Sequence, residues 1–116
     1  EIYQLVLKAH EASYSAMRPG APCKDIDGVA RQIITDAGYG DQFGHGLGHG
    51  IGLELWEEPF MNTTSTAVMS ENMVIAVEPG VYLPGWGGIR IEDTVLITAN
   101  GCESLNQTSK ELLELI

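Results

Sequence analysis

The stretch Phe43–Pro59 reads FGHGLGHGIGLELWEEP and holds two of the chain's three histidines, His45 and His49, with five alternating glycines. Glycine lets the backbone approach a neighbour closely, but it weakens regular secondary structure. A stretch that gives up side-chain packing to carry two imidazoles is more typical of a binding site than of a scaffold. The alternative, a flexible surface loop, predicts polar flanks, whereas Ile51–Leu55 continues in the apolar alternation of a strand.

Two amphipathic helices are expected before this stretch. Residues 1–18 place aliphatic side chains on one broad stripe, and the Arg-Pro-Gly sequence at 18–20 ends that helix. Asp25 is a candidate N-cap for a second helix, whose C-terminal stop is Gly38. His10 lies on the first helix, where we expect an ordinary surface or partly packed histidine.

Strands joined by tight turns are expected after it. Met73–Val77 is a continuous apolar run that Val81–Leu83 extends, and Ile89–Thr98 is the clearest strand pattern. Asn100-Gly101 is a strong hairpin signal. Ser109–Ile116 has the pattern of a short C-terminal helix. Helices followed by strands predict an α+β fold, in which helices cover one face of an antiparallel sheet.

Composition narrows the classes of partner and location. A chain of 116 residues forms one domain at most, and its net charge of −10 disfavours nucleic acid and anionic membranes. No run reaches transmembrane length, and no signal-peptide pattern is present. Cys23 and Cys102 lack metal-type spacing and indicate free thiols in a reducing compartment, which favours the cytoplasm. The chain opens at Glu1 inside a helical pattern, so we expect a piece of a longer protein.

Two glutamates complete the set of candidate site residues. Glu78 follows the apolar run Met73–Val77, where burying an acid is costly unless it is paired or bound to a metal. The alternative is a solvated position at the rim of the sheet. Strand alternation puts Arg90 and Glu92 on one face, and we expect the nearby guanidinium to keep the carboxylate ionised. An exposed Arg–Glu pair on a solvated sheet face is equally compatible with this pattern.

The spacing of the two histidines limits what they do together. If the stretch is extended, His45 and His49 lie roughly 13 Å apart, at roughly 3.3 Å per residue. We therefore expect one histidine to serve a metal and the other to serve the substrate. Glutamates with one imidazole suit Zn, Mn, Co or Fe better than Ca or Mg. Such a site also suits two metals about 3.5–4 Å apart that share a nucleophilic water.

Three motifs in this order resemble the Xaa-Pro dipeptidase and Xaa-Pro aminopeptidase family of pita-bread-fold dinuclear metallopeptidases, relatives of methionine aminopeptidase and creatinase. They are GHGLGHGIGLE at 44–54, VEPGVY at 77–82 and GIRIEDTVLIT at 88–98. The preceding helices also fit, so the resemblance covers essentially all of residues 1–116. It implies the C-terminal portion of a pita-bread catalytic domain, a hydrolase that cleaves Xaa-Pro bonds in a peptide substrate by a metal-bridged hydroxide.

The resemblance also implies a metal centre. His49 matches the one histidine that ligates metal. Glu78 matches a metal ligand that also serves as the catalytic general base. Glu92 matches the glutamate that bridges the two divalent ions, which are Mn, Co or Zn. The family's two ligating aspartates lie on strands that precede this chain, and Asp25 and Asp27 lie at the wrong place to substitute for them. Residues 1–116 are therefore expected to be a partial catalytic domain, inactive alone, with a missing N-terminal segment or a second copy as partner.

Four further residues match positions that contact the substrate. His45 matches a substrate-binding, catalytic histidine of the prolyl-specific members, and Tyr82 and Arg90 match residues that support substrate and carboxylate geometry. Trp56 stands where the family has a second substrate-contacting histidine, and its indole keeps an N–H donor but no basic nitrogen. The choice between dipeptidase and aminopeptidase stays open. The alternative to an enzyme is a non-catalytic pita-bread module that binds peptide or protein.

Overall fold

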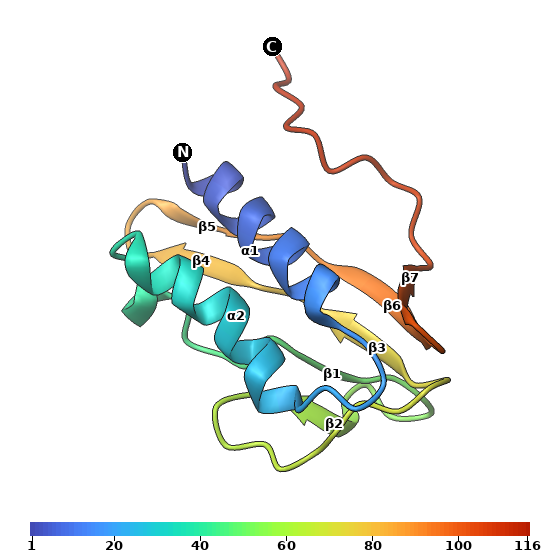
Figure 1. Ribbon diagram of the computed structural model, residues 1–116. Helices are drawn as coiled ribbons and strands as arrows, with labels where there is room; N and C mark the ends of the chain where they lie inside the picture. The colour runs from blue at the N-terminus through green and yellow to red at the C-terminus, as the bar shows by residue number, and fades with distance from the viewer.

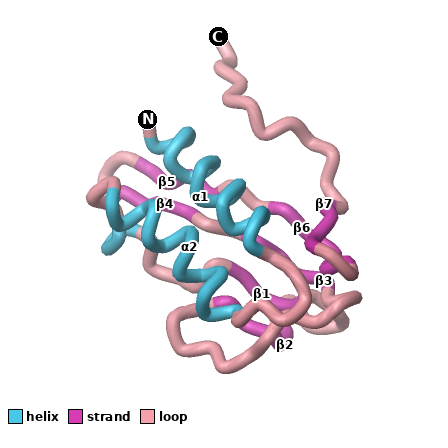
Figure 2. The backbone as a smooth tube through the Cα atoms, in the orientation of Figure 1, coloured by secondary structure: helices cyan, strands magenta, loops and turns pink.

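Two helices lie side by side across one face of an antiparallel sheet in the computed structural model, which describes residues 1–116 (Figures 1 and 2). The predicted α+β arrangement of helices followed by strands is therefore confirmed. In chain order the elements are α1 (Ile2–Ala16), α2 (Cys23–Asp36), the 3₁₀ helix η1 (Gly40–Gln42), β1 (Gly48–Gly50), β2 (Glu57–Met61), β3 (Val74–Val77), β4 (Gly80–Leu83), β5 (Gly87–Arg90), β6 (Asp93–Thr98) and β7 (Gly101–Ser104).

The helix ends follow local chemistry. Met17, the C-cap of α1, is already extended just before the Arg-Pro-Gly sequence. Pro22 is the N-cap of α2, so the prediction that Asp25 caps this helix is wrong. Proline favours the start of a helix because its φ is preset, and Asp25 instead lies in the first turn, where its charge complements the helix dipole. Gly38 has a φ of +90° and ends the helix, as predicted.

The five-stranded sheet has the order β2-β1-β3-β6-β7, with every neighbouring pair antiparallel. β4 and β5 form a separate hairpin, so residues 81–83 do not extend β3 as the apolar run predicted. The single strand predicted over Ile89–Thr98 is divided at Ile91-Glu92, because β5 pairs with β4 whereas β6 pairs with β3. The hairpin predicted near Asn100 is confirmed between β6 and β7.

Two predicted regular segments are absent. Ile51–Leu55 is a bend-rich loop, so the alternation there does not mark a strand. Ser109–Ile116 is not helical: Lys110 still contacts the body of the molecule, but the C-terminal end of the segment runs away from it (Figure 1). Its four large apolar side chains are exposed, and so short a helix has little stability in water without a surface to pack on.

The hydrophobic core lies between the helices and the sheet. Side chains of β3 and β6 that point to the helices, such as Val77 and Val95, are fully buried against α1 and α2. Gly48 belongs to this face of β1, and a Cβ built there would lie 1.8 Å from the carbonyl oxygen of Ala76. Glycine is thus required in β1 by the close approach of its neighbouring strand. The opposite face of the sheet remains open for a site.

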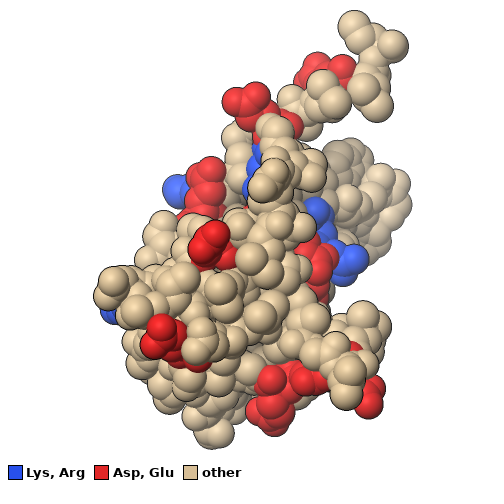
Figure 3. Space-filling view, turned by 90° about the vertical axis from the view of Figure 1, so that its right-hand side faces the viewer, with Lys and Arg blue, Asp and Glu red and all other residues tan.

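Neither helix is long and apolar enough to span a lipid bilayer. Acidic side chains are spread over the face of the molecule seen in Figure 3, where basic side chains are few.

Candidate active site

The candidate residues converge on the face of the sheet that the helices leave open. His49 in β1 pairs with Ala76 in β3, and Glu78 follows two residues later on the same face. These residues line a cavity of about 460 Å³. The predicted site residues that line it are His49, Trp56, Glu78, Arg90 and Glu92. The structure thus brings together side chains that are up to 43 positions apart in the sequence.

His49 is held with one ring nitrogen facing Glu78. Its Nδ1 lies 2.8 Å from the carbonyl oxygen of Gly50, which accepts a hydrogen bond, so Nδ1 carries the proton. Nε2 then has a free lone pair, 4.0 Å from Oε2 of Glu78. A histidine whose second nitrogen is fixed by a carbonyl in this way is the usual form of a metal ligand.

Glu92 lies beside Glu78, and the two carboxylates act on one another. Partial burial raises the pKa of Glu92 above its ordinary value, and the neighbouring Glu78 carboxylate raises it further. Arg90 and His49 oppose this rise with smaller effects. Arg90 thus favours the ionised form of Glu92, as the sequence predicts, but its effect on the pKa is smaller than the effects of burial and of the second acid. Carboxylate and imidazole are the types of ligand that divalent cations of the first transition row accept.

His45 lies on a second cavity of about 330 Å³ that His49, Glu78 and Arg90 also line. Its Nδ1 lies 2.7 Å from Gly46 O, and its Nε2 lies 2.6 Å from the hydroxyl of Tyr82. Since the carbonyl is an acceptor only, Nδ1 donates and Nε2 accepts from the hydroxyl. Burial raises the pKa of Tyr82, which keeps this hydroxyl protonated.

Trp56 lines both cavities from the loop before β2. Its ring meets the His49 ring edge-on, with centroids 6.4 Å apart, although 65% of the residue is exposed. An indole here gives the site an apolar wall next to the imidazole.

No group of three or more His, Cys, Asp or Glu side chains in the structure is arranged to hold a metal ion. Asp25 and Asp27 contribute nothing to the open face. Asp25 is exposed on α2, whereas Asp27 is buried and bonded to Arg31 and to the backbone of Leu47. Cys23 and Cys102 are free thiols, as predicted.

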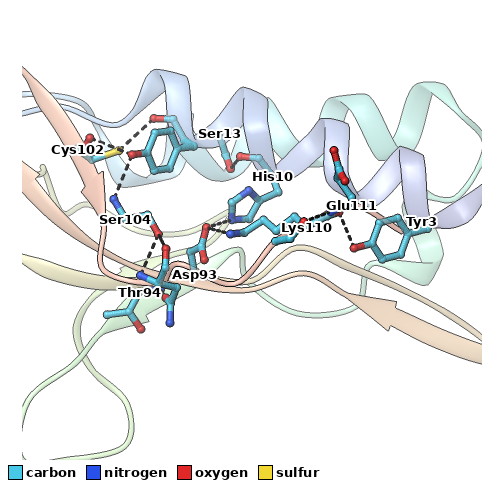
Figure 4. A network of polar contacts seen from close by, with 12 residues as sticks. Tyr3, His10, Ser13, Asp93, Thr94, Cys102, Ser104, Lys110 and Glu111 are labelled. Carbon is cyan, nitrogen blue, oxygen red and sulfur yellow. Dashed lines mark hydrogen bonds and ion pairs between the residues drawn. The ribbon is translucent and has the colours of Figure 1, made fainter. Parts of the chain in front are cut away.

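A polar network on the helix-facing side of β6 was missed (Figure 4). His10 is 3% exposed, so the prediction of a surface or partly packed histidine is wrong; its Nε2 lies 3.4 Å from Oδ2 of Asp93. Lys110 reaches the same oxygen at 2.7 Å, and Tyr3 donates to the carbonyl of Lys110 at 2.7 Å. The one signal in the sequence was Asp93 itself, an acid at a core-facing position of an otherwise apolar alternation.

Comparisons with known proteins agree with this geometry. The solved structure of the prolidase from Pyrococcus horikoshii OT3 superposes with a TM-score of 0.94 at 47% identity, over 97% of this chain and 32% of that one. The Xaa-Pro dipeptidase from Bacillus anthracis superposes with a TM-score of 0.95 at 42% identity, over 98% and 32%. The curated Xaa-Pro dipeptidase of Pyrococcus furiosus is 51% identical over 113 residues, 97% of this chain and 32% of its own length.

The fold is thus part of the pita-bread fold of the prolidases. The chain belongs to metallopeptidase family M24, whose sequence profile matches residues 1–99. It spans about a third of the length of the relatives it matches.

Proposed function

We propose that this chain is the metal-ligating part of a peptidase that hydrolyses the bond before proline, as an Xaa-Pro dipeptidase or aminopeptidase. The observation that supports this proposal is the convergence of His49, Glu78 and Glu92 on the open face of the sheet. The names of the similar proteins favour a dipeptidase among these alternatives.

In this proposal His49 through Nε2, Glu78 and Glu92 would hold divalent ions. Two further aspartates come from a segment that precedes Glu1 in the whole protein. Mn, Co or Zn suits this mixture of carboxylates and imidazole. When bound, such ions supply Lewis-acid polarisation of the peptide carbonyl and lower the pKa of water.

The remaining residues bind the peptide and move protons. Glu78 takes the proton of the attacking water and passes it to the leaving proline nitrogen. His45, oriented by Tyr82, contacts the substrate near the scissile bond, and Arg90 holds a carboxylate. Trp56 forms the apolar wall of the cavity and donates its indole N–H, but it carries no proton between groups.

The proposal also has consequences for the cell and for assembly. Two free thiols favour a reducing compartment, and we propose the cytoplasm. The exposed apolar side chains of the loop at residues 51–56 favour contact with the preceding segment or with a second copy of the protein.

The test is hydrolysis of Leu-Pro and of a longer Xaa-Pro peptide by the full-length protein loaded with Mn²⁺, beside Met-Ala as an unrelated peptide. We expect cleavage before proline only, loss of cleavage in His49→Ala, and none by residues 1–116 alone. Leu-Pro cleavage assigns a dipeptidase, and cleavage of only the longer peptide assigns an aminopeptidase. Hydrolysis by the 116-residue chain, or none by the metal-loaded full-length protein, contradicts the proposal.

A second candidate is a non-catalytic module that binds peptides through the same cavity. The observation in its favour is Trp56. The resemblance to the prolyl-specific members implies a histidine at this position, and this chain has an indole there instead. The variant Trp56→His separates the two candidates in the full-length protein. An enzyme is expected to change its rate or substrate preference in this variant, whereas a binding module stays without hydrolysis and changes only its peptide affinity.

A further inference from the structure

Arg31 of α2 binds the backbone of the histidine-bearing segment Phe43–Leu47. Its Nη1 donates to Phe43 O at 2.9 Å, and its Nη2 donates to His45 O at 2.8 Å. The guanidinium carbon also lies 4.2 Å from the centroid of the Phe43 ring, a cation–π distance. One side chain on α2 therefore holds two carbonyl groups that are 12 and 14 residues further along the chain.

Asp27 binds Arg31 and the same segment at once. Its carboxylate accepts from Nε and Nη2 of Arg31 at 2.8 and 2.9 Å. Oδ1 also accepts from the backbone N–H of Leu47 at 3.0 Å. Because the Asp27 side chain is 1% exposed, these partners take the place of water around its carboxylate. We call these two residues the Asp27–Arg31 clamp.

The clamp fixes the peptide groups on both sides of Gly46. Arg31 holds His45 O, and Asp27 holds Leu47 N, so the direction of the Gly46 carbonyl between them is constrained. That carbonyl accepts the hydrogen bond from Nδ1 of His45 at 2.7 Å. The tautomer that results leaves Nε2 as the acceptor for the Tyr82 hydroxyl at 2.6 Å.

A neighbouring pair on α2 shows what a simple intrahelical contact looks like. Gln32 donates to Asp36 at the same i,i+4 spacing, but both residues are exposed and neither contacts the histidine segment. Arg31 differs because its planar fork reaches the Asp27 carboxylate and two carbonyls together. A lysine has a single nitrogen and does not reproduce this geometry.

We propose that Asp27 and Arg31 are positioning residues for His45: their clamp on the Phe43–Leu47 backbone sets the ring tautomer and holds Nε2 at the cavity. The inference rests on the proposed function only for the role of His45 toward the substrate. The clamp itself is a property of the fold and is measurable without any substrate.

The first arm of the test is amide hydrogen exchange in the full-length protein, read by mass spectrometry on peptides that cover residues 43–49. We expect exchange there to be about tenfold faster in Arg31→Lys and in Asp27→Asn, and unchanged in the matched control Gln32→Ala. Unchanged exchange in both clamp variants overturns the proposal. This arm gives its answer even if the protein hydrolyses no Xaa-Pro peptide, in which case the proposed function fails separately.

The second arm uses Leu-Pro hydrolysis with metal content measured in parallel. We expect Arg31→Lys to lower kcat/KM by about tenfold. Its metal content and its pH profile are expected to be the same as those of the control Gln32→Ala. In the background of His45→Asn, Arg31→Lys is expected to have no further effect, because both changes remove the same positioned imidazole. Multiplicative losses from the two variants, or a loss of metal in Arg31→Lys, contradict a positioning role for the clamp.

Discussion

Lys110 is the residue whose loss tests the contacts between the C-terminal segment and the core. Its Nζ lies 2.7 Å from Oδ2 of Asp93, and the Asp93 side chain is 4% exposed (Figure 4). The other nearby group, His10, has its pKa lowered chiefly by burial, with Asp93 acting against that shift. Lys110 is therefore the charge that neutralises Asp93 at neutral pH. The variant Lys110→Met keeps the apolar stem and removes only this charge.

The expected loss follows from the burial of the two partners. Removing one partner of a buried ion pair costs about 3–5 kcal/mol, whereas exposed pairs contribute about 0–1 kcal/mol. The side chain of Lys110 is 24% exposed, so water partly screens the pair. We expect Lys110→Met to lower the free energy of unfolding by about 2–3 kcal/mol near pH 8.

The loss is expected to shrink as the pH falls. In the wild type the pKa of His10 is below its unfolded value, so protonation of His10 favours unfolding and stability falls below about pH 6.5. Lys110 is one of the charges that lower this pKa, so removing it leaves the pKa of His10 less strongly lowered. His10 then binds its proton at a higher pH in the folded variant than in the folded wild type, and this partly compensates for the missing charge. The stability curves of the two proteins therefore approach one another as the pH falls below about 6.5.

The assay is urea unfolding of the full-length protein, followed by circular dichroism near pH 8 and near pH 6. The control is Lys8→Met, which removes an exposed lysine from α1. A loss below about 1 kcal/mol in Lys110→Met near pH 8 refutes the buried pair. A loss that does not shrink at the lower pH refutes the link to His10.

Three further variants test the sheet and the site. Gly48→Ala puts a methyl group 1.8 Å from Ala76 O, so we expect urea unfolding to show a free energy of unfolding that is lower by about 3 kcal/mol or more. The control is Gly28→Ala, where no atom lies within 4 Å of the new methyl group, and it is expected to be neutral or stabilising. Ile97→Ala removes a fully buried side chain of β6, and the same assay is expected to show a loss of about 2–5 kcal/mol. Because the folded pKa of Glu92 is raised, its ionisation near pH 7 disfavours the metal-free fold. In the presence of chelator, Glu92→Gln is therefore expected to have a higher melting temperature than the wild type, and this difference vanishes at about pH 4.5. With Mn²⁺ present, its melting temperature is expected to be lower than that of the wild type. A lower melting temperature of Glu92→Gln in chelator at pH 7 counts against the carboxylate pair.

The faces of the strands were predictable because side-chain alternation is a property of extended backbone. Residues 89–98 change partner strand at Ile91-Glu92, yet Ile91, Val95 and Ile97 remain on the buried side and Arg90 on the other. The alternation therefore placed Arg90 on the site-facing side correctly without identifying the break between β5 and β6. The break itself depends on which strand pairs with which, and that information is not local.

The polar contacts that support the site were not predictable for a similar reason. His10 and Asp93 are 83 positions apart, and Arg31 meets the carbonyl of His45 across a turn and a 3₁₀ helix. No periodic pattern signals such contacts, because each polar residue is locally compatible with solvent. The predicted C-terminal helix is absent for the opposite reason: its local sequence pattern favours a helix, but its large apolar side chains are exposed in the structure.

The central claim is that His49, Glu78 and Glu92 hold divalent metal for cleavage before proline. The most direct measurement is the metal content of the full-length protein by mass spectrometry, taken together with its rate of Leu-Pro hydrolysis. The account predicts about two Mn²⁺, Co²⁺ or Zn²⁺ ions per chain and a measurable rate, with both reduced in Glu92→Gln and in His49→Ala. Full metal content and an unchanged rate in these two variants would contradict it.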